Sequence, residues 1–251
     1  MRRLFHALAL LALLAATAAR SEPAVITLAS DAWPRYVDAS GGYLVEVCKA
    51  VFAAHGYRVQ VKITPFTRAT ALVQSGAADV VPALYREPDR GVLFAGDYTA
   101  IDETAVLINT SRIKWDGRLR ALNGKTVGWI RGFNYAPELA RTYQLHVDAY
   151  EVNDRQTALA MLRQGRLDAV MDNAEELASL ARQQHMAAPD FVIASVFRKP
   201  LYFGFADTPR GRMLRALFDH EIARMKTSGR LAALYRQLVP GGPDLAGPVT
   251  R

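Results

Sequence analysis

The chain has 251 residues, of which 51% are hydrophobic and 22% charged, with a formal net charge of +7 and a single cysteine. This length and apolar content can build one large core or two smaller ones, which excludes an intrinsically disordered chain. One cysteine excludes an intramolecular disulfide framework and a cysteine-rich zinc site.

The N-terminal segment has the pattern of a secretory signal peptide. Arg2 and Arg3 precede an apolar stretch over 7–19, and small residues at 16–18 offer a cleavage site. The stretch is shorter than the roughly 20 residues of a membrane span. A buried N-terminal helix is the alternative, although a helix with no polar face fits a core poorly at a chain end. We therefore expect residues 1–19 to be removed and the protein to be periplasmic, and no cysteine directly follows the stretch to carry a lipid.

Short apolar runs alternate with amphipathic segments from residue 24 to residue 205, which is typical of βα units. Gly56 ends the first amphipathic segment, and Thr64 and Pro65 begin the second with a capping hydroxyl and a proline at the first helical position. The first series predicts strands over 25–29, 57–63, 79–84 and 104–108 and helices over 42–55 and 64–76.

A second series repeats the same order of elements and predicts a second lobe with its own mostly parallel sheet. Its strands are expected over 126–130, 146–152 and 167–171, and its helices over 136–143, 154–163 and 173–182. A strand over 200–205 follows, then a long helix capped by Thr208 and Pro209 and a last helix over 229–238. Three prolines and three glycines in 240–251 predict a disordered tail. The core should include Cys48, Phe52, Phe66, Leu72 and Phe218.

Catalytic and cofactor motifs are absent from the sequence. Gly124, Lys125 and Thr126 resemble the end of a phosphate-binding loop, but Leu119 stands where that loop needs glycine. The four histidines after residue 19 are far apart, and no segment interleaves basic and aromatic residues as a nucleic-acid surface would. We therefore expect no cofactor, no metal site and no nucleic-acid partner.

Several weak motifs together resemble the periplasmic solute-binding proteins of the polar amino-acid uptake class, extracellular solute-binding protein family three. The resemblance covers about residues 24–238 and lies in the order and spacing of the motifs. In chain order they are 42–47 (GYLVEV), 57–59 (YRV), 65–69 (PFTRA), 76–80 (GAADV), 85–90 (YREPDR), 127–132 (VGWIRG), 165–172 (GRLDAVMD) and 201–205 (LYFGF).

The resemblance implies a type II periplasmic-binding-protein fold, with two α/β lobes joined by two crossover strands near Ile108 and Pro200. Lobe one would comprise 24–108 and 200–238, and lobe two 109–199. It also implies a non-enzymatic monomer that binds a small polar solute, such as an amino acid, in the cleft and delivers it to a membrane ABC permease.

The family positions for charged ligand groups fall on Arg90 and Asp172. A guanidinium binds a carboxylate through two parallel hydrogen bonds, and a carboxylate accepts from an ammonium group. Arg86, one helical turn from Arg90, is the alternative for the carboxylate. Both arginines could instead be solvent-exposed side chains that pair with Asp89 or Glu87. Asp172 could instead cap the next helix.

The remaining family positions are mainly aromatic. Trp33 and Tyr36 are placed to cover the ligand, Tyr85 belongs to the same cleft, and Phe133 and Asn134 follow the first strand of lobe two. Trp33 could instead be a half-buried anchor, and Asn134 a turn residue or helix cap.

The sequence departs from the family pattern at two places. Glu87 stands where a threonine or serine usually helps to bind the carboxylate, and the segment 82–85 lacks the hydroxyl-rich run that usually lines lobe one. Two other functions stay open on this scaffold. One is an exported enzyme resembling the cyclohexadienyl dehydratases, with Glu87 or Asp172 as its acid. The other is a ligand-sensing module for a membrane receptor.

Overall fold

A computed structural model describes residues 24–87, 90–133 and 135–245 of the chain. The predicted signal peptide over 1–19, residue Asn134 and the end of the predicted tail lie outside the described residues. Among the helices that are described, none is long and apolar enough to cross a membrane.

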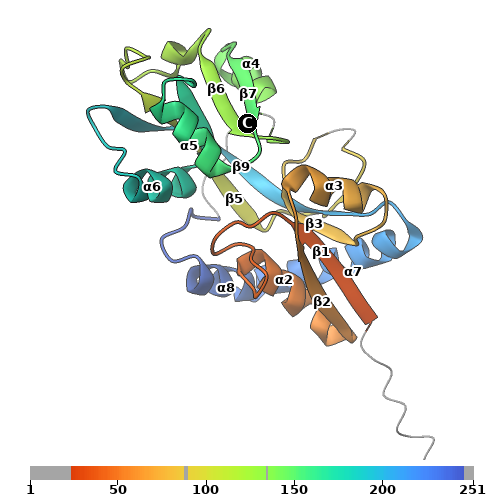
Figure 1. Cartoon of the computed structure of the whole chain (residues 1–251). Coiled ribbons are helices and arrows are strands. Elements are labelled where there is room, and N and C mark those ends of the chain that lie inside the picture. The colour runs from red at the N-terminus through yellow and green to blue at the C-terminus, as the bar shows by residue number, and fades with distance from the viewer. Residues whose placement is uncertain (1–23, 88–89, 134, 246–251) are drawn as a thin grey trace, which may run out of the picture.

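The described residues form two lobes that share one continuous mixed sheet in the order β2-β1-β3-β9-β5-β8-β6-β7, with β4 beside β9 (Figure 1). The strands are β1 (Ala24–Ser30), β2 (Tyr57–Ile63), β3 (Val80–Leu84), β4 (Leu93–Phe94), β5 (Ala100–Asn109), β6 (Thr126–Ile130), β7 (Asp148–Val152), β8 (Ala169–Asn173) and β9 (Phe191–Phe205). The helices are α2 (Tyr43–Phe52), α3 (Phe66–Gln74), α4 (Ala136–Tyr143), α5 (Arg155–Arg163), α6 (Ala174–Gln183), α7 (Pro209–Thr227) and α8 (Arg230–Leu238), with 3-10 turns at Ala53–His55 and Leu119–Leu122.

The long strands β5 and β9 run between the lobes and pair with each other in antiparallel orientation (Figure 1). The end of β9 pairs with β3 and β4 in the first lobe, whereas β5 pairs with β8 in the second. The two-lobed α/β fold is therefore confirmed, and the sheets of the two lobes are continuous through β5 and β9.

These two strands are longer than the sequence predicts. β5 begins at Ala100, and its residues from Thr104 to Ile108 already pair with β8, so the chain enters the second lobe before Thr104 rather than near Ile108. β9 begins at Phe191 instead of residue 200. Charged residues interrupt the apolar pattern in both strands, and a proline does so in β9, but pairing between the strands overrides this local signal.

Side-chain caps fix where several helices begin. Thr208 caps α7 by accepting from the Gly211 amide at 3.0 Å, as predicted. Asp154 caps α5, and Asn173 caps α6 through the amides of the first turn. The predicted capping role of Thr64 is wrong, because the N-cap position of α3 is Pro65 and no side-chain hydrogen bond caps that helix.

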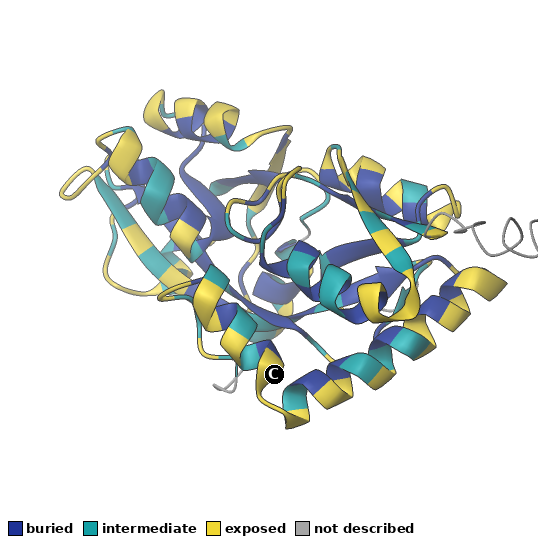
Figure 2. Cartoon of the chain, turned by 90° about the horizontal axis from the view of Figure 1, so that it is seen from below, coloured by how far each residue is buried: buried dark blue, intermediate teal, exposed yellow. Residues whose placement is uncertain are grey.

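The core of the first lobe lies between its sheet and the helices α2, α7 and α8. Cys48, Phe52 and Phe218 are fully buried there, as predicted, and the Phe52 and Phe218 rings lie 6.2 Å apart between centroids. Leu72, also expected in the core, is only partly buried. Figure 2 shows the central strands largely buried and the helices exposed along their outer faces, whereas the edge strands β2 and β7 are mostly exposed or half-buried.

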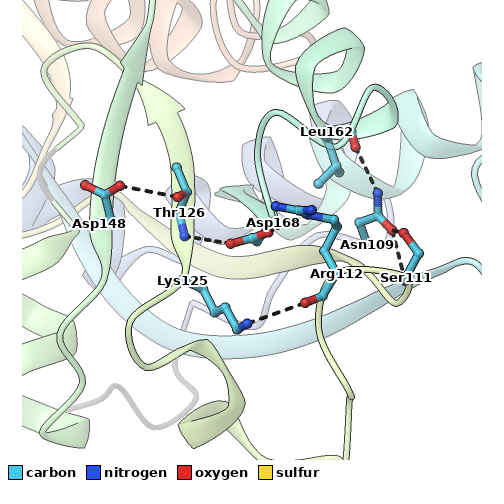
Figure 3. A network of polar contacts seen from close by, with 8 residues as sticks. All are labelled: Asn109, Ser111, Arg112, Lys125, Thr126, Asp148, Leu162 and Asp168. Atoms are coloured by element: carbon cyan, nitrogen blue, oxygen red, sulfur yellow. Dashed lines mark hydrogen bonds and ion pairs between the residues drawn. The ribbon is translucent and has the colours of Figure 1, made fainter.

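A network of hydrogen bonds and an ion pair connects the segments at the end of the second lobe where β6 and β8 begin (Figure 3). The Asp168 carboxylate accepts from the Arg112 Nε and from the Thr126 amide, each at 3.0 Å. The Asn109 side chain donates to the Leu162 carbonyl at 3.0 Å. This network lies at the start of β8, while Asp172 lies at its other end, so it stabilises the lobe without entering the cleft.

Candidate functional site

A cavity lies between the lobes at the carboxyl ends of their parallel strands. Asp31 directly follows β1, Tyr85 follows β3, Gly132 follows β6 and Asp172 lies near the end of β8. Ligands of open α/β sheets bind at this edge, because the loops that follow the strands converge there. The cavity holds about 570 Å³ of empty space, counted out to its open mouth. Its described lining residues are Asp31, Trp33, Phe66, Ala83, Tyr85, Arg90, Asp102, Gly132, Phe133, Tyr135, Arg155, Asp172, Asn173 and Leu201.

Arg155 connects two aspartates across the cavity. Its Nε donates to Asp172 Oδ2 at 2.7 Å, and its Nη2 donates to Asp172 Oδ1 at 3.3 Å. Its Nη1 lies 3.9 Å from Asp31 Oδ2, which belongs to the other lobe. The Asp172 side chain is only 3% exposed, whereas that of Asp31 is 21% exposed.

Burial raises the pKa of Asp31 from its ordinary value of 3.8 to about 6. The Arg155 guanidinium opposes this rise and the Asp172 carboxylate adds to it. Asp31 is therefore a carboxyl group at the cleft whose charged form is poorly compensated.

Asp102 is a third aspartate of the cavity, and the donors that bind it among the described residues are uncharged. Tyr85 donates to its Oδ2, the Thr104 hydroxyl donates to the same oxygen at 2.7 Å, and Asn173 Nδ2 donates to its Oδ1 at 2.8 Å. Burial raises the pKa of Asp102, and these hydrogen bonds oppose the rise. Because β5 carries Asp102 between the lobes, this network links the first lobe, the crossover strand and the second lobe.

The two arginines predicted for a ligand carboxylate have different surroundings. Arg90 lines the cavity, with its guanidinium carbon 5.6 Å from the centroid of the Phe66 ring and Nη1 bonded to Glu87 Oε2 at 2.8 Å. Arg86 does not line the cavity. Its Nη2 donates to the Ala95 and Gly96 carbonyls, and its guanidinium carbon lies 4.1 Å from the centroid of the Tyr202 ring.

Three of the predicted aromatic residues, Trp33, Tyr85 and Phe133, line the cavity. Tyr36 does not: it is 1% exposed, and its ring stacks on Trp33 with centroids 3.8 Å apart. The Tyr36 hydroxyl also lies 3.1 Å from that of Tyr235, so Tyr36 supports Trp33 from the core side. The predicted contact of Asn134 lies outside the described residues.

Sequence reasoning missed several lining residues. Asp31, Asp102 and Arg155 were not selected, and Phe66 was assigned to the core although it also faces the cleft. Asp31 directly follows a predicted strand and Arg155 begins the helix after another, so position at the carboxyl edge was the available signal. Asp102 had no such signal, because it lies within a strand that was predicted to begin later.

The lobes touch beside the cavity. The Phe66 and Phe133 rings meet edge to face, with centroids 5.1 Å apart. A β-carbon added at Gly132 would lie 2.7 Å from the Thr67 side chain, so a glycine is needed there for the lobes to come this close. Arg35 of the first lobe also forms an ion pair with Glu175 of the second.

No cluster of three or more histidine, cysteine, aspartate or glutamate side chains suited to a metal ion occurs among the residues that the structure describes.

The sequence matches the bacterial extracellular solute-binding proteins, family 3, over residues 26–240. The chain belongs to this family. No curated protein matches it.

Solved structures with a similar fold include a mutant of ArgBP from T. maritima, at 18% identity and a TM-score of 0.67 over 87% of this chain and 96% of that one. A histidine kinase sensor domain with similarity to periplasmic binding proteins has 20% identity and a TM-score of 0.71, covering 88% of this chain and 98% of that one. The ancestral amino-acid-binding protein AncCDT-1, a precursor of cyclohexadienyl dehydratase, has 19% identity and a TM-score of 0.67, covering 85% and 95%. At these identities the likeness concerns the fold of this family 3 protein.

Proposed function

We propose that this family 3 protein binds a small polar solute, such as an amino acid, between its lobes in the periplasm and delivers it to a membrane ABC permease. The observation that carries the proposal is the charged cavity, to which Asp31 and Arg90 contribute from one lobe and Arg155 and Asp172 from the other. A charged solute that leaves water needs fixed partners of opposite charge, and this cavity supplies both signs.

Contacts from both lobes also couple binding to closure. A solute that touches both lobes stabilises the arrangement in which the lobes lie close together, because it has more partners there. Phe66, Phe133 and Gly132 lie where the two lobes already meet, so a solute in the cavity beside them can touch both lobes.

The test uses protein that has been unfolded and refolded to remove any retained solute. Each of the twenty L-amino acids is titrated by calorimetry, and the radius of gyration is followed by small-angle scattering. We expect at least one amino acid to bind with a dissociation constant in the micromolar range or below and to make the molecule more compact. Absence of binding and of compaction with the whole panel would refute the amino-acid proposal.

A matched pair of variants locates the site. Arg90→Gln removes a guanidinium that lines the cavity, whereas Arg86→Gln removes one that is held by backbone carbonyls outside it. We expect Arg90→Gln to weaken binding about tenfold or more, the scale of a lost charged hydrogen bond, and Arg86→Gln to change it little. Equal effects of the two variants would place the carboxylate of the solute elsewhere.

The raised pKa of Asp31 favours a second candidate, an exported enzyme of the dehydratase type. A general acid must hold a proton near the working pH, and a carboxyl group with a pKa of about 6 does so better than an ordinary aspartate. Incubation with prephenate or arogenate separates the two functions. Steady consumption of either compound, lost in Asp31→Asn, would establish the enzyme, and binding without consumption would establish the binding protein.

A further inference from the structure

The Asp172 carboxylate, which occupies the family position for an ammonium group, has a partner within the protein. Both of its oxygens accept from Arg155, and Oδ1 also accepts from the Asn173 amide at 2.7 Å. Two nitrogens of the guanidinium therefore face the two oxygens of one carboxylate. The Asp172 side chain of this pair is almost fully buried. Breaking such a pair leaves an uncompensated buried charge, so an incoming ammonium group would not displace Arg155.

The Asp31 carboxylate, in contrast, has no hydrogen bond from Arg155. The nearest Arg155 nitrogen is 3.9 Å from its Oδ2, which is an ion-pair distance but too long for a hydrogen bond. Its side chain is 21% exposed, against 3% for Asp172, and it lines the cavity. A cation in the cavity can therefore reach the oxygens of Asp31 while those of Asp172 are occupied.

The charges of the cavity favour the same assignment. The described lining residues include three carboxyl groups, Asp31, Asp102 and Asp172, and two cations, Arg90 and Arg155. Asp102 is bound by Tyr85, Thr104 and Asn173, so its oxygens already have donors. Asp31 is the remaining carboxyl group of the described lining, and its hydrogen bonds come from its neighbour Ser30 and from its own backbone amide rather than from another strand or helix.

We propose that Arg155 is a specificity-determining residue, which holds Asp172 out of the binding reaction and leaves Asp31 as the carboxylate that accepts the cationic group of the solute. This inference rests on the proposed function and names the acceptor within the same cavity. The binding geometry therefore differs from the one that the family position of Asp172 implies, because the cation is held from the first lobe.

Binding should then be coupled to proton release. The charged groups that face Asp31 are Arg155, which lowers its pKa, and Asp172, which raises it, and Glu176 is part of the same electrostatic cluster. An ammonium group beside Asp31 adds a second cation, so the carboxylate gives up its proton when the solute binds. At a pH near 6 about half of the Asp31 groups carry a proton, so roughly half a proton should be released per bound solute.

The experiment is calorimetric titration of the refolded full chain with the twenty L-amino acids, in two buffers of different ionisation enthalpy at pH 6 and at pH 8. We expect proton release of about 0.5 at pH 6 that nearly vanishes at pH 8. Asp31→Asn should weaken binding about tenfold or more and abolish the release. Asp38→Asn is the matched control, because Asp38 lies in the same loop but is exposed and binds Ser40.

A double variant gives the sharper test. Arg155→Gln frees Asp172, so Asp31→Asn combined with Arg155→Gln should recover at least part of the affinity that Asp31→Asn alone loses. Binding that survives Asp31→Asn within threefold and releases no proton would overturn the inference and leave the proposed function intact. Failure of every amino acid to bind the wild-type protein would remove the proposed function together with it. Circular dichroism and thermal unfolding establish that each variant is folded.

Discussion

Replacement of Asp31 by asparagine should change how the stability of the ligand-free protein depends on pH. The carboxyl group has a pKa of about 6 in the folded protein and an ordinary value of 3.8. Between these two values the folded state binds more protons than the unfolded state, so stability falls as pH rises. The difference corresponds to about 3 kcal/mol, which is present below pH 4 and lost as pH rises through 6. An asparagine cannot ionise, so Asp31→Asn does not suffer this loss.

Urea unfolding followed by tryptophan fluorescence at several pH values between 4 and 7.5 measures the effect. Relative to wild type, Asp31→Asn should gain about 2 kcal/mol over this range, with the main change between pH 4 and pH 6. Asp38→Asn should differ from wild type by a nearly constant amount over this range, because hydrogen bonds from Ser40 lower the pKa of the exposed Asp38 and the group is already largely ionised in both states. A difference between Asp31→Asn and wild type that is constant over this pH range would refute the assignment of a poorly compensated carboxyl group to the cleft.

Three substitutions and one chemical modification test other parts of the structure. Gly132→Ala places a β-carbon 2.7 Å from Thr67 in a backbone with φ of +89°, so calorimetry should show weaker solute binding. Phe218→Ala should lower the free energy of unfolding by about 3–5 kcal/mol in urea titrations. Thr208→Ala removes the cap of α7 and should lower it by about 1 kcal/mol in the same assay. Burial raises the pKa of Cys48, so a thiol reagent should modify it only after unfolding.

The individual helices and strands were predictable because each has its own hydrophobic periodicity and its own residues that favour a start or an end. The strand Thr126–Ile130 and the helix Ala136–Tyr143 agree with the sequence prediction at both ends. The crossover strands were predicted too short, since Asp102, Glu103, Arg198 and Lys199 lie inside them and suggest a loop when they are considered alone. Only the pairing of β5 with β9, which are about 90 residues apart, makes these positions part of a strand.

The site could be predicted in its location but not in its pairings. The carboxyl ends of parallel strands converge, so residues such as Trp33, Tyr85, Phe133 and Asp172 were candidates without any knowledge of distances. The sequence does not show that Arg155 binds Asp172, because α5 and β8 are separate elements whose ends meet only in the folded lobe. The same holds for Arg86 and Arg90, which are one turn apart in sequence yet face different surroundings.

Asp31 links stability to binding in a way that can be tested with one variant. In the ligand-free protein a buried, partly compensated carboxyl group lowers stability at neutral pH, so its removal should stabilise the fold. If the same carboxylate accepts the cation of the solute, its removal should also weaken binding. Asp31→Asn should therefore be more stable than wild type without solute and should gain less stability when solute is added. If Asp31 had only a structural role, Asp31→Asn would change the stability without solute but not the stability gained when solute is added. Measuring both quantities in the same preparation therefore separates a structural role from a binding role.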